Sequence, residues 1–135
     1  MEVKTIKKPW GEEIWFAQNN HYAGKILKVK KGHRYSLQYH ERKIETQYLY
    51  KGSIKLTFGS EPENLQERIL QVGEKFDINP PTIHRVEALE DSEIFEVSTP
   101  ELDDVVKLHD DYGRSGKGNN FESDQSLHSQ NFTNN

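Results

Sequence analysis

Short runs in which apolar and polar residues alternate set the strongest limit on how this chain folds. They lie at Lys25–Lys30, Thr46–Tyr50, Ser53–Phe58, Arg68–Val72, Phe76–Ile78, Ile83–Leu89 and Glu93–Ser98. Residues suited to turns stand between them, among them Gly52, Gly73 and Pro80-Pro81. A side-chain period of two is typical of strands that bury one face. Strands at such even spacing, with only Glu101–Leu108 suited to a helical turn or two, predict an all-β sandwich or closed barrel.

Composition excludes several classes of protein. The chain has 135 residues, no cysteine and a net charge of −4. This length suits one domain, and without cysteine neither a disulfide nor a thiolate metal site is possible. No block of basic residues marks a nucleic-acid surface, and no apolar stretch approaches the roughly 20 residues of a membrane span. Met1–Lys8 lacks the apolar segment of a secretory signal, so we expect a cytoplasmic protein.

The C-terminal residues have a different composition from the rest. From Ser115 to Asn135 the chain is mostly Ser, Asn, Gln, Gly and Asp, and its apolar residues are Phe121, Leu127 and Phe132. So few apolar side chains do not offset the entropy lost when a segment becomes ordered. We therefore expect one domain at residues 1–114 and a polar, disordered tail at residues 115–135.

Four candidate metal ligands lie in two stretches of the chain. Gln38, His40 and Glu45 lie between Gly32 and Gly52, and His84 lies in a stretch that begins at Gly73. Imidazole and carboxylate groups bind Zn²⁺, Mn²⁺ or Fe²⁺, whereas the weaker amide oxygen favours harder ions. Gln38 and His40 are two residues apart and share a face, while Glu45 needs an intervening turn, which Glu41-Arg42-Lys43 supplies. His84 has the parity of the apolar positions in its run and should point inward. Each residue alone also fits a hydrogen-bonded core or a solvated surface, but together they predict one metal site.

The ligand spacing resembles the two motifs of the cupin superfamily. The motifs read Gly32-x5-Gln38-x-His40-x4-Glu45-x6-Gly52 and Gly73-x10-His84. Glutamine at the first ligand position is similar to the cupin domain of type II mannose-6-phosphate isomerases. Further matches to that family are Lys8-Pro9-Trp10-Gly11, Thr82-Ile83-His84-Arg85 and the segment from Asp103 to Arg114. The resemblance covers most of residues 6–114 and implies a single-domain double-stranded β-helix, or jelly-roll barrel, with a metal in its mouth.

This resemblance also implies an activity. It is that of a metal-dependent sugar-phosphate isomerase, most like mannose-6-phosphate isomerase, which interconverts aldose and ketose through a metal-stabilised enediolate. One divalent ion is expected, zinc first, with manganese, iron or nickel as alternatives. A phosphorylated sugar as substrate and a homodimer are expected in the same way.

Site roles follow from the same resemblance. Glu96 and Lys43 are the expected catalytic residues, and Arg85, Lys107 and Arg114 the expected substrate-binding residues. The parity of Glu96 is opposite to that of Phe95 and Val97, which leaves open whether it faces inward or outward.

Departures from the family pattern keep other functions open. Glu41-Arg42-Lys43 stands where the family tends to have His-His-Arg, and lysine lacks the bidentate fork of arginine. Gln47 replaces a usual Trp, while Asn79 and Pro81 replace a Pro and a Gly of the cupin pattern. The alternatives are a non-catalytic, metal-containing cupin that binds a sugar or small acid, and an iron-dependent oxygenase-type cupin. Cations facing the metal would favour a phosphorylated ligand, and an apolar mouth would favour the oxygenase.

Overall fold

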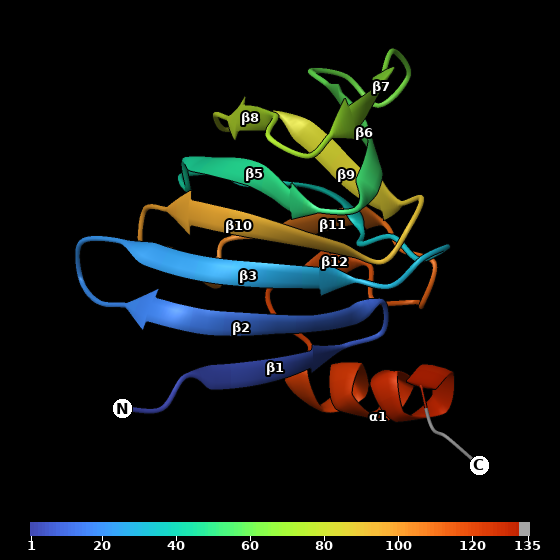
Figure 1. Cartoon of the computed structure of the whole chain (residues 1–135). Helices are drawn as coiled ribbons and strands as arrows, with labels where there is room; N and C mark the ends of the chain where they lie inside the picture. Colours follow the sequence, from blue (N-terminus) through green and yellow to red (C-terminus); the bar gives the residue numbers. More distant parts are fainter. Residues whose placement is uncertain (133–135) are drawn as a thin grey trace.

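Two antiparallel sheets face one another in the computed structural model, which describes residues 1–132 (Figure 1). The first sheet has the order β1-β2-β3-β10-β5-β8, with bounds Lys4–Lys8, Gly11–Gln18, Ala23–Val29, Ser92–Ser98, Glu45–Lys51 and Lys75–Ile78. The second has the order β12-β11-β4-β9-β6-β7, with bounds Gly116–Lys117, Val106–His109, Leu37–Tyr39, Ile83–Ala88, Ser53–Gly59 and Gln66–Gln71. Helix α1, Phe121–Phe132, lies beneath β1 at one end of the molecule. The predicted all-β, jelly-roll architecture is confirmed.

All seven expected strands are present, as β3 and β5 to β10. Their inward faces meet in one core, whose members are Trp10, Leu27, Val29, Tyr35, Leu49, Ile54, Leu56, Leu70, Val86, Ala88 and Ile94. The turn between β5 and β6 requires a glycine. Gly52 has φ +95°, and a Cβ atom there would lie 2.6 Å from the carbonyl oxygen of Asp91. This close approach joins the two sheets at that corner.

Residues 101–108 differ from the helical turns that their pattern predicts. They contain a turn followed by strand β11, in which Val106 pairs with Tyr39 and Lys107 with Gln38. The reason is tertiary, because β4 offers its backbone groups to this segment and a short isolated helix has little stability of its own. As a result β11 lies next to the strand that carries Gln38.

The C-terminal segment also differs from its expectation as far as residue 132. Instead of a disordered tail it forms β12 and helix α1, which packs along β1. Asp124 is fully buried and pairs with Lys8 and Arg114, while His128 Nδ1 bonds to the carbonyl oxygens of Lys8 and Gly11. Buried ion pairs and hydrogen bonds, which an apolar count overlooks, order this segment. Residues 133–135 of the expected tail lie outside the described residues.

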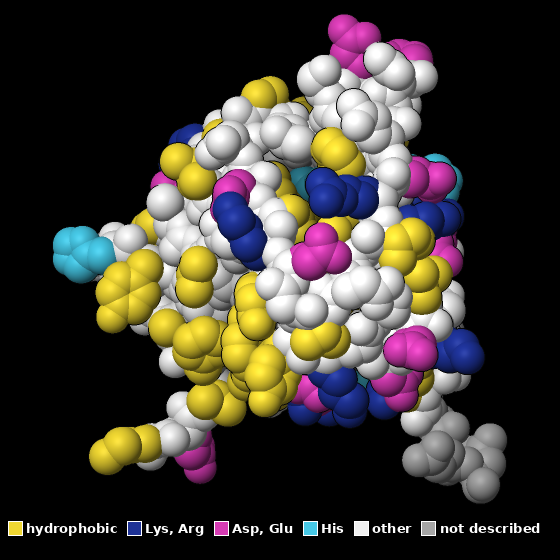
Figure 2. Space-filling view, turned by 45° about the horizontal axis from the view of Figure 1, so that its top comes forward, with side chains coloured by type: hydrophobic (Ala, Val, Ile, Leu, Met, Phe, Trp, Pro, Cys, Tyr) yellow, Lys and Arg dark blue, Asp and Glu magenta, His cyan; other side chains and the backbone are white. Residues whose placement is uncertain are grey.

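The outer face of the first sheet carries exposed apolar side chains (Figure 2). Phe16 on β2, Val97 on β10 and Tyr48 and Tyr50 on β5 are all exposed, and the Tyr50 ring stacks on Phe95 at 4.9 Å. An apolar sheet face of this kind is common at protein interfaces. Among residues 1–132, no helix has the length and apolar character needed to cross a membrane.

Candidate metal centre

Two histidines and a glutamate meet inside the barrel. His40 directly follows β4, Glu45 begins β5 and His84 lies in β9. Each offers one ligand atom, and these three atoms lie within 4.8 Å of one another. All three side chains are buried. The structure thus brings together three of the four expected metal ligands from three different strands.

Hydrogen bonds set which imidazole nitrogen faces this centre. His40 Nδ1 bonds to the carbonyl oxygen of Asp104, and His84 Nδ1 bonds to that of Thr82 at 3.0 Å. A carbonyl oxygen only accepts, so each Nδ1 carries a proton and, in the neutral ring, each Nε2 presents a lone pair. Burial lowers the pKa of His40, which favours its neutral form.

Both Nε2 atoms face the same carboxylate oxygen. His40 Nε2 and His84 Nε2 each lie 3.3 Å from Glu45 Oε1. Burial is the largest influence and raises the pKa of Glu45, but the Lys43 ammonium and the imidazoles of His40 and His84 together more than offset it, and the pKa lies well below its usual value. His84 Nε2 has no hydrogen-bond partner, and the contact of Glu45 Oε2 is with the Lys43 ammonium, 3.2 Å away. Electron-pair donors that face one another repel unless a cation lies between them, so this donor set fits a divalent metal ion.

Gln38 lies in the same part of the barrel. It is paired with His84 in the register between β4 and β9, and it lines the same cavity as His40. Its Oε1 accepts a hydrogen bond of 2.6 Å from Ser36 Oγ. Gln38 is thus close to the donor set, with its amide oxygen held by a neighbouring hydroxyl group.

Asp104 holds the loop that carries the donors. Its carboxylate accepts the backbone N–H groups of Glu41, Arg42 and Lys43 at 3.1, 2.7 and 2.8 Å. Its carbonyl oxygen accepts the Nδ1 proton of His40. This residue therefore shapes the predicted turn between His40 and Glu45 and also orients one imidazole.

Glu96 and Lys43, the two expected catalytic residues, lie beside the donor set. Lys43 Nζ is 3.2 Å from Glu45 Oε2 and 3.4 Å from Glu96 Oε2. Gln47 Nε2 donates to one oxygen of each glutamate, at 3.4 Å for Glu45 and 3.2 Å for Glu96. Burial, and then the negative charge of Glu45, raises the pKa of Glu96 to about 7. A carboxyl group that titrates near neutrality is suited to both taking up and releasing a proton.

A small cavity of about 60 Å³ adjoins these residues. Five cationic side chains line it: Lys8, Lys25, Lys43, Lys107 and Arg114. Apolar side chains such as Trp10 and Leu27 form only part of its wall. The carboxyl groups of Glu13 and Glu96 line it as well, so the cavity is suited to a charged, polar ligand rather than an apolar one.

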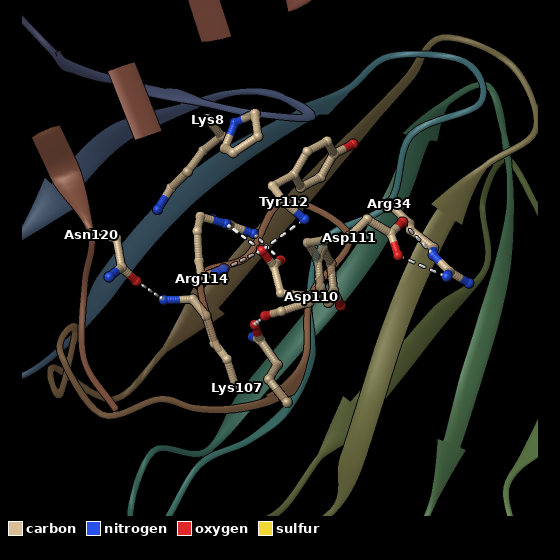
Figure 3. A network of polar contacts seen from close by, with 12 residues as sticks. Lys8, Arg34, Lys107, Asp110, Asp111, Tyr112, Arg114 and Asn120 are labelled. Carbon is tan, nitrogen blue, oxygen red and sulfur yellow. Dashed lines mark hydrogen bonds and ion pairs between the residues drawn. The ribbon is translucent and has the colours of Figure 1, made fainter. Parts of the chain in front are cut away.

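Three of these cations lie near α1. Figure 3 draws Lys8, Lys107 and Arg114 in one group, with Arg114 bonded to Asp110 at 2.7 Å and Lys107 bonded to Asn120. Lys8 Nζ and Arg114 Nη1 contact the two oxygens of Asp124 at 2.9 and 3.1 Å. Lys107 Nζ donates to Gly118 O and Asn120 Oδ1. Burial, followed by the charges of Arg114 and Lys8, lowers the pKa of Lys107 to about 8. We call Lys8, Lys107 and Arg114 the cation cluster.

Arg85, the third expected substrate-binding residue, does not line this cavity. Its Nε donates to the carbonyl oxygen of Tyr35 at 2.8 Å, and its Nη2 donates to that of His109 at 3.1 Å. Because His84 points inward, its neighbour on the strand must point to the opposite side. Arg85 thus ties backbone segments together on the other face of β9.

Other residues line the cavity although the sequence analysis assigns them no site role: Lys8, Glu13, Lys25, Tyr35 and Gln47. The buried Tyr35 hydroxyl has no hydrogen-bond partner. The sequence does contain an indication that Lys25 points inward, because Lys25 alternates in step with the apolar residues Leu27 and Val29. A charged residue at an inward position is an indication of a site.

Known structures with the same fold include several enzymes. KdgF from Halomonas sp. is 22% identical, with a TM-score of 0.63, covering 75% of this chain and 89% of its own. Oxalate decarboxylase from Bacillus subtilis, solved at pH 4.6, is 16% identical, with a TM-score of 0.68, covering 79% of this chain and 30% of its own. CapF bound to 3-isopropenyl-tropolone is 17% identical, with a TM-score of 0.63, covering 80% of this chain and 34% of its own. This chain thus spans about a third of the latter two proteins, and the likeness establishes a cupin fold.

A search of curated proteins gave no match. The profile of the family described as mannose-6-phosphate isomerase C-terminal matches residues 1–110. This range includes the three converging donors, Gln38 and Lys107, and it ends before Arg114 and α1. The chain therefore belongs to the family of the mannose-6-phosphate isomerase C-terminal domain, a family of cupins.

Proposed function

We propose that this protein is a divalent-metal-dependent isomerase of a phosphorylated sugar, most like mannose-6-phosphate isomerase. One observation carries the proposal: a buried donor set of His40, Glu45 and His84 adjoins a cavity lined by five cationic side chains. The oxygenase alternative calls for an apolar mouth, which this cavity lacks. A phosphate group and a polar sugar match the charge of the wall.

The residues divide into a reacting end and an anchoring end. Glu96 and Lys43 lie at the donor set, whereas the cation cluster is the group of cations nearest α1. The cation cluster binds the phosphate, and this fixes the distance of the sugar carbons from Glu96. Holding the substrate at both ends reduces the entropy lost on reaching the reactive geometry.

Proton transfer between two adjacent sugar carbons is assigned to Glu96. A metal on His40, Glu45 and His84, with Gln38 as fourth ligand, would supply a Lewis acid that polarises the sugar carbonyl. Glu96, with a pKa of about 7, accepts the proton from C2 and returns it at C1. The ammonium of Lys43 stabilises the ionised form of Glu96, and the free hydroxyl of Tyr35 can donate to a sugar oxygen.

Zinc is our first choice for the metal, because two imidazoles and a carboxylate are ordinary zinc ligands. The amide oxygen of Gln38 leaves room for harder ions, and Mn(II) centres are described for oxalate decarboxylase from Bacillus subtilis. Metal reconstitution should therefore include zinc, manganese, iron and nickel.

We further propose a homodimer formed through the outer face of the first sheet. The exposed Phe16, Tyr48, Tyr50 and Val97 make this face apolar enough to associate with a second copy of itself.

The test of the isomerase proposal combines metal analysis with a panel of hexose and pentose phosphates. The metal-loaded protein should interconvert an aldose phosphate and its ketose. His84→Ala should lose both metal and turnover, whereas His109→Ala, which removes an exposed histidine, should retain both. Glu96→Gln should keep its metal but lose roughly 10²–10⁴-fold in rate, the range for a general acid–base. Full metal occupancy without turnover on any of these sugars would overturn the proposal and favour a binding protein.

A further inference from the structure

Asp124 is the one buried residue of α1 within the described part of that helix. Its side chain is completely inaccessible, and its two oxygens bind Lys8 and Arg114 at 2.9 and 3.1 Å. The same segment supplies Gly118 O and Asn120 Oδ1, which accept hydrogen bonds from Lys107 at 2.7 and 2.8 Å. Residues 115–132 therefore provide partners to every member of the cation cluster.

The cation cluster that makes these contacts also lines the cavity, and this cavity is small for a substrate. Its volume of about 60 Å³ has room for a few water molecules. Ligand sites usually enclose about 300–1,000 Å³. Because Asn119 lines this cavity, the C-terminal segment forms part of the wall that makes it small.

Polar contacts and two aromatic contacts hold the helix. The Phe121 ring lies 6.2 Å from that of Trp15, and the Phe132 ring lies 5.2 Å from that of His33. None of its described apolar residues, Phe121, Leu127 and Phe132, is fully buried. Hydrogen bonds from His128 Nδ1 to the carbonyl oxygens of Lys8 and Gly11, and from Asn131 Nδ2 to that of Pro9, attach it further. The family profile matches residues 1–110, so α1 lies outside the matched range. The ion pairs of Asp124, unlike the aromatic contacts, are open to competition by another anion.

We propose that residues 115–132 form a displaceable plug, in which Asp124 occupies the position that the phosphate of a phosphate monoester takes when it binds the cation cluster. In the closed form, the carboxylate of Asp124 contacts Lys8 and Arg114, which also pair with Glu13 at 3.9 Å and with Asp110 at 2.7 Å, respectively. A phosphate dianion, with three acceptor oxygens, satisfies Lys107 as well, whose hydrogen bonds otherwise go to two neutral oxygens. Binding of the phosphate releases α1 and enlarges the cavity, so substrate entry and plug opening are one event.

This inference rests on the proposed function in a single respect, that the anionic group of the ligand binds at the cation cluster. It requires no turnover. Inorganic phosphate is therefore the probe, compared with chloride at matched ionic strength on the full-length, metal-loaded protein. Repeating the measurements in His84→Ala separates phosphate bound at the cation cluster from phosphate bound at the metal, so failure of the isomerase proposal remains distinguishable from failure of the plug.

Two measurements test the plug. In hydrogen exchange, saturating phosphate should speed exchange of the amides of residues 121–132 at least tenfold. In calorimetry, Asp124→Asn should bind phosphate about tenfold more tightly than the wild type, because the competing charge is removed and the open form is more populated. Glu122→Gln makes the same charge change at an exposed position in the same helical turn and should bind within twofold of the wild type.

A second variant covers the case in which Asp124→Asn does not fold. His128→Ala removes two of the hydrogen bonds that attach the helix but keeps Asp124 and all three cations, and it should bind phosphate several-fold more tightly. If α1 were a permanent part of the cavity wall, phosphate would leave the exchange of its amides unchanged and neither variant would bind phosphate more tightly. If phosphate binds while α1 stays protected, or if neither variant binds more tightly, the plug is refuted.

Discussion

Glu13 and Glu96 are buried carboxyl groups that line the same cavity, yet their pKa values move in opposite directions. Burial raises the pKa of both. At Glu13 the nearby ammonium groups of Lys25 and Lys8 more than offset burial and lower the pKa to about 2. At Glu96 the negative charge of Glu45 adds to burial, and the pKa rises to about 7. Glu13 therefore remains ionised and paired with the lysines of the cavity, whereas Glu96 is able to exchange a proton near neutral pH.

This difference predicts how acid affects stability through Glu13. Its pKa in the folded protein, about 2, lies below the ordinary value of 4.5, so the folded state binds the proton less readily than the unfolded state. The resulting stabilisation is present above pH 4.5 and is lost as the pH falls toward 2. Its size is about 3 kcal/mol, from 1.36 kcal/mol per pKa unit.

Urea unfolding of the wild type and Glu13→Gln at several pH values would measure this effect. Glu13→Gln should be less stable at neutral pH, because Lys25 then lacks its partner, and the difference should narrow by about 3 kcal/mol toward pH 2. Glu63→Gln, an exposed glutamate between β6 and β7, should show a small, constant difference. A gap for Glu13→Gln that is independent of pH would contradict the assignment.

At the scale of elements, the loop between β4 and β5 depends on the segment that precedes β11. Three backbone N–H groups at residues 41–43 donate to the carboxylate of Asp104, about 60 residues further along the chain. No local pattern predicts this, because the acceptor comes from a distant segment. The loop places His40 before Glu45, so its geometry controls the donor set.

Asp104→Ala should therefore weaken metal binding without removing a ligand. We expect a 10–100-fold loss of affinity, the usual effect of removing a group that orients metal ligands, measured by competition with a chelating dye. Asp103→Ala, the adjacent exposed aspartate, serves as the matched control and should bind metal like the wild type. Equal affinities for the two variants would show that the loop holds its shape without Asp104.

For the whole molecule, the outer face of the first sheet is the region where a second copy would pack. Val97 on β10 is 58% exposed, and Val72, just beyond β7 of the other sheet, is 57% exposed. The two positions have the same residue type and exposure but lie on different sheets. This makes them a matched pair for testing the dimer.

Val97→Glu should convert a dimer to monomers in sedimentation velocity experiments, because a charge on each copy would be brought into an apolar interface. Val72→Glu should leave the dimer intact. A wild-type protein that sediments as a monomer at all concentrations, or a dimer that persists in Val97→Glu, would place the association elsewhere or exclude it.

The sequence by itself determined the strands, the inward direction of His84 and the shared face of Gln38 and His40, because side-chain alternation is a local property of a strand. It also indicated the ligand residues, whose spacing resembles a known family. Only the tertiary structure decided which residues surround them. The cation cluster joins Lys8 to Lys107 and Arg114 from opposite ends of the chain, and Arg85 turns away because its neighbour His84 faces inward.

The two segments that depart from expectation, residues 101–108 and 115–132, do so for one physical reason. A strand needs a partner strand, and a buried carboxylate on a helix needs a partner of opposite charge. For β11 the partner is β4, and for Asp124 one of the partners is Lys8; both are far away in sequence. Local propensity and apolar content describe a segment alone, whereas the order of β11 and α1 comes from the free energy of contacts made with β4, Lys8 and Arg114.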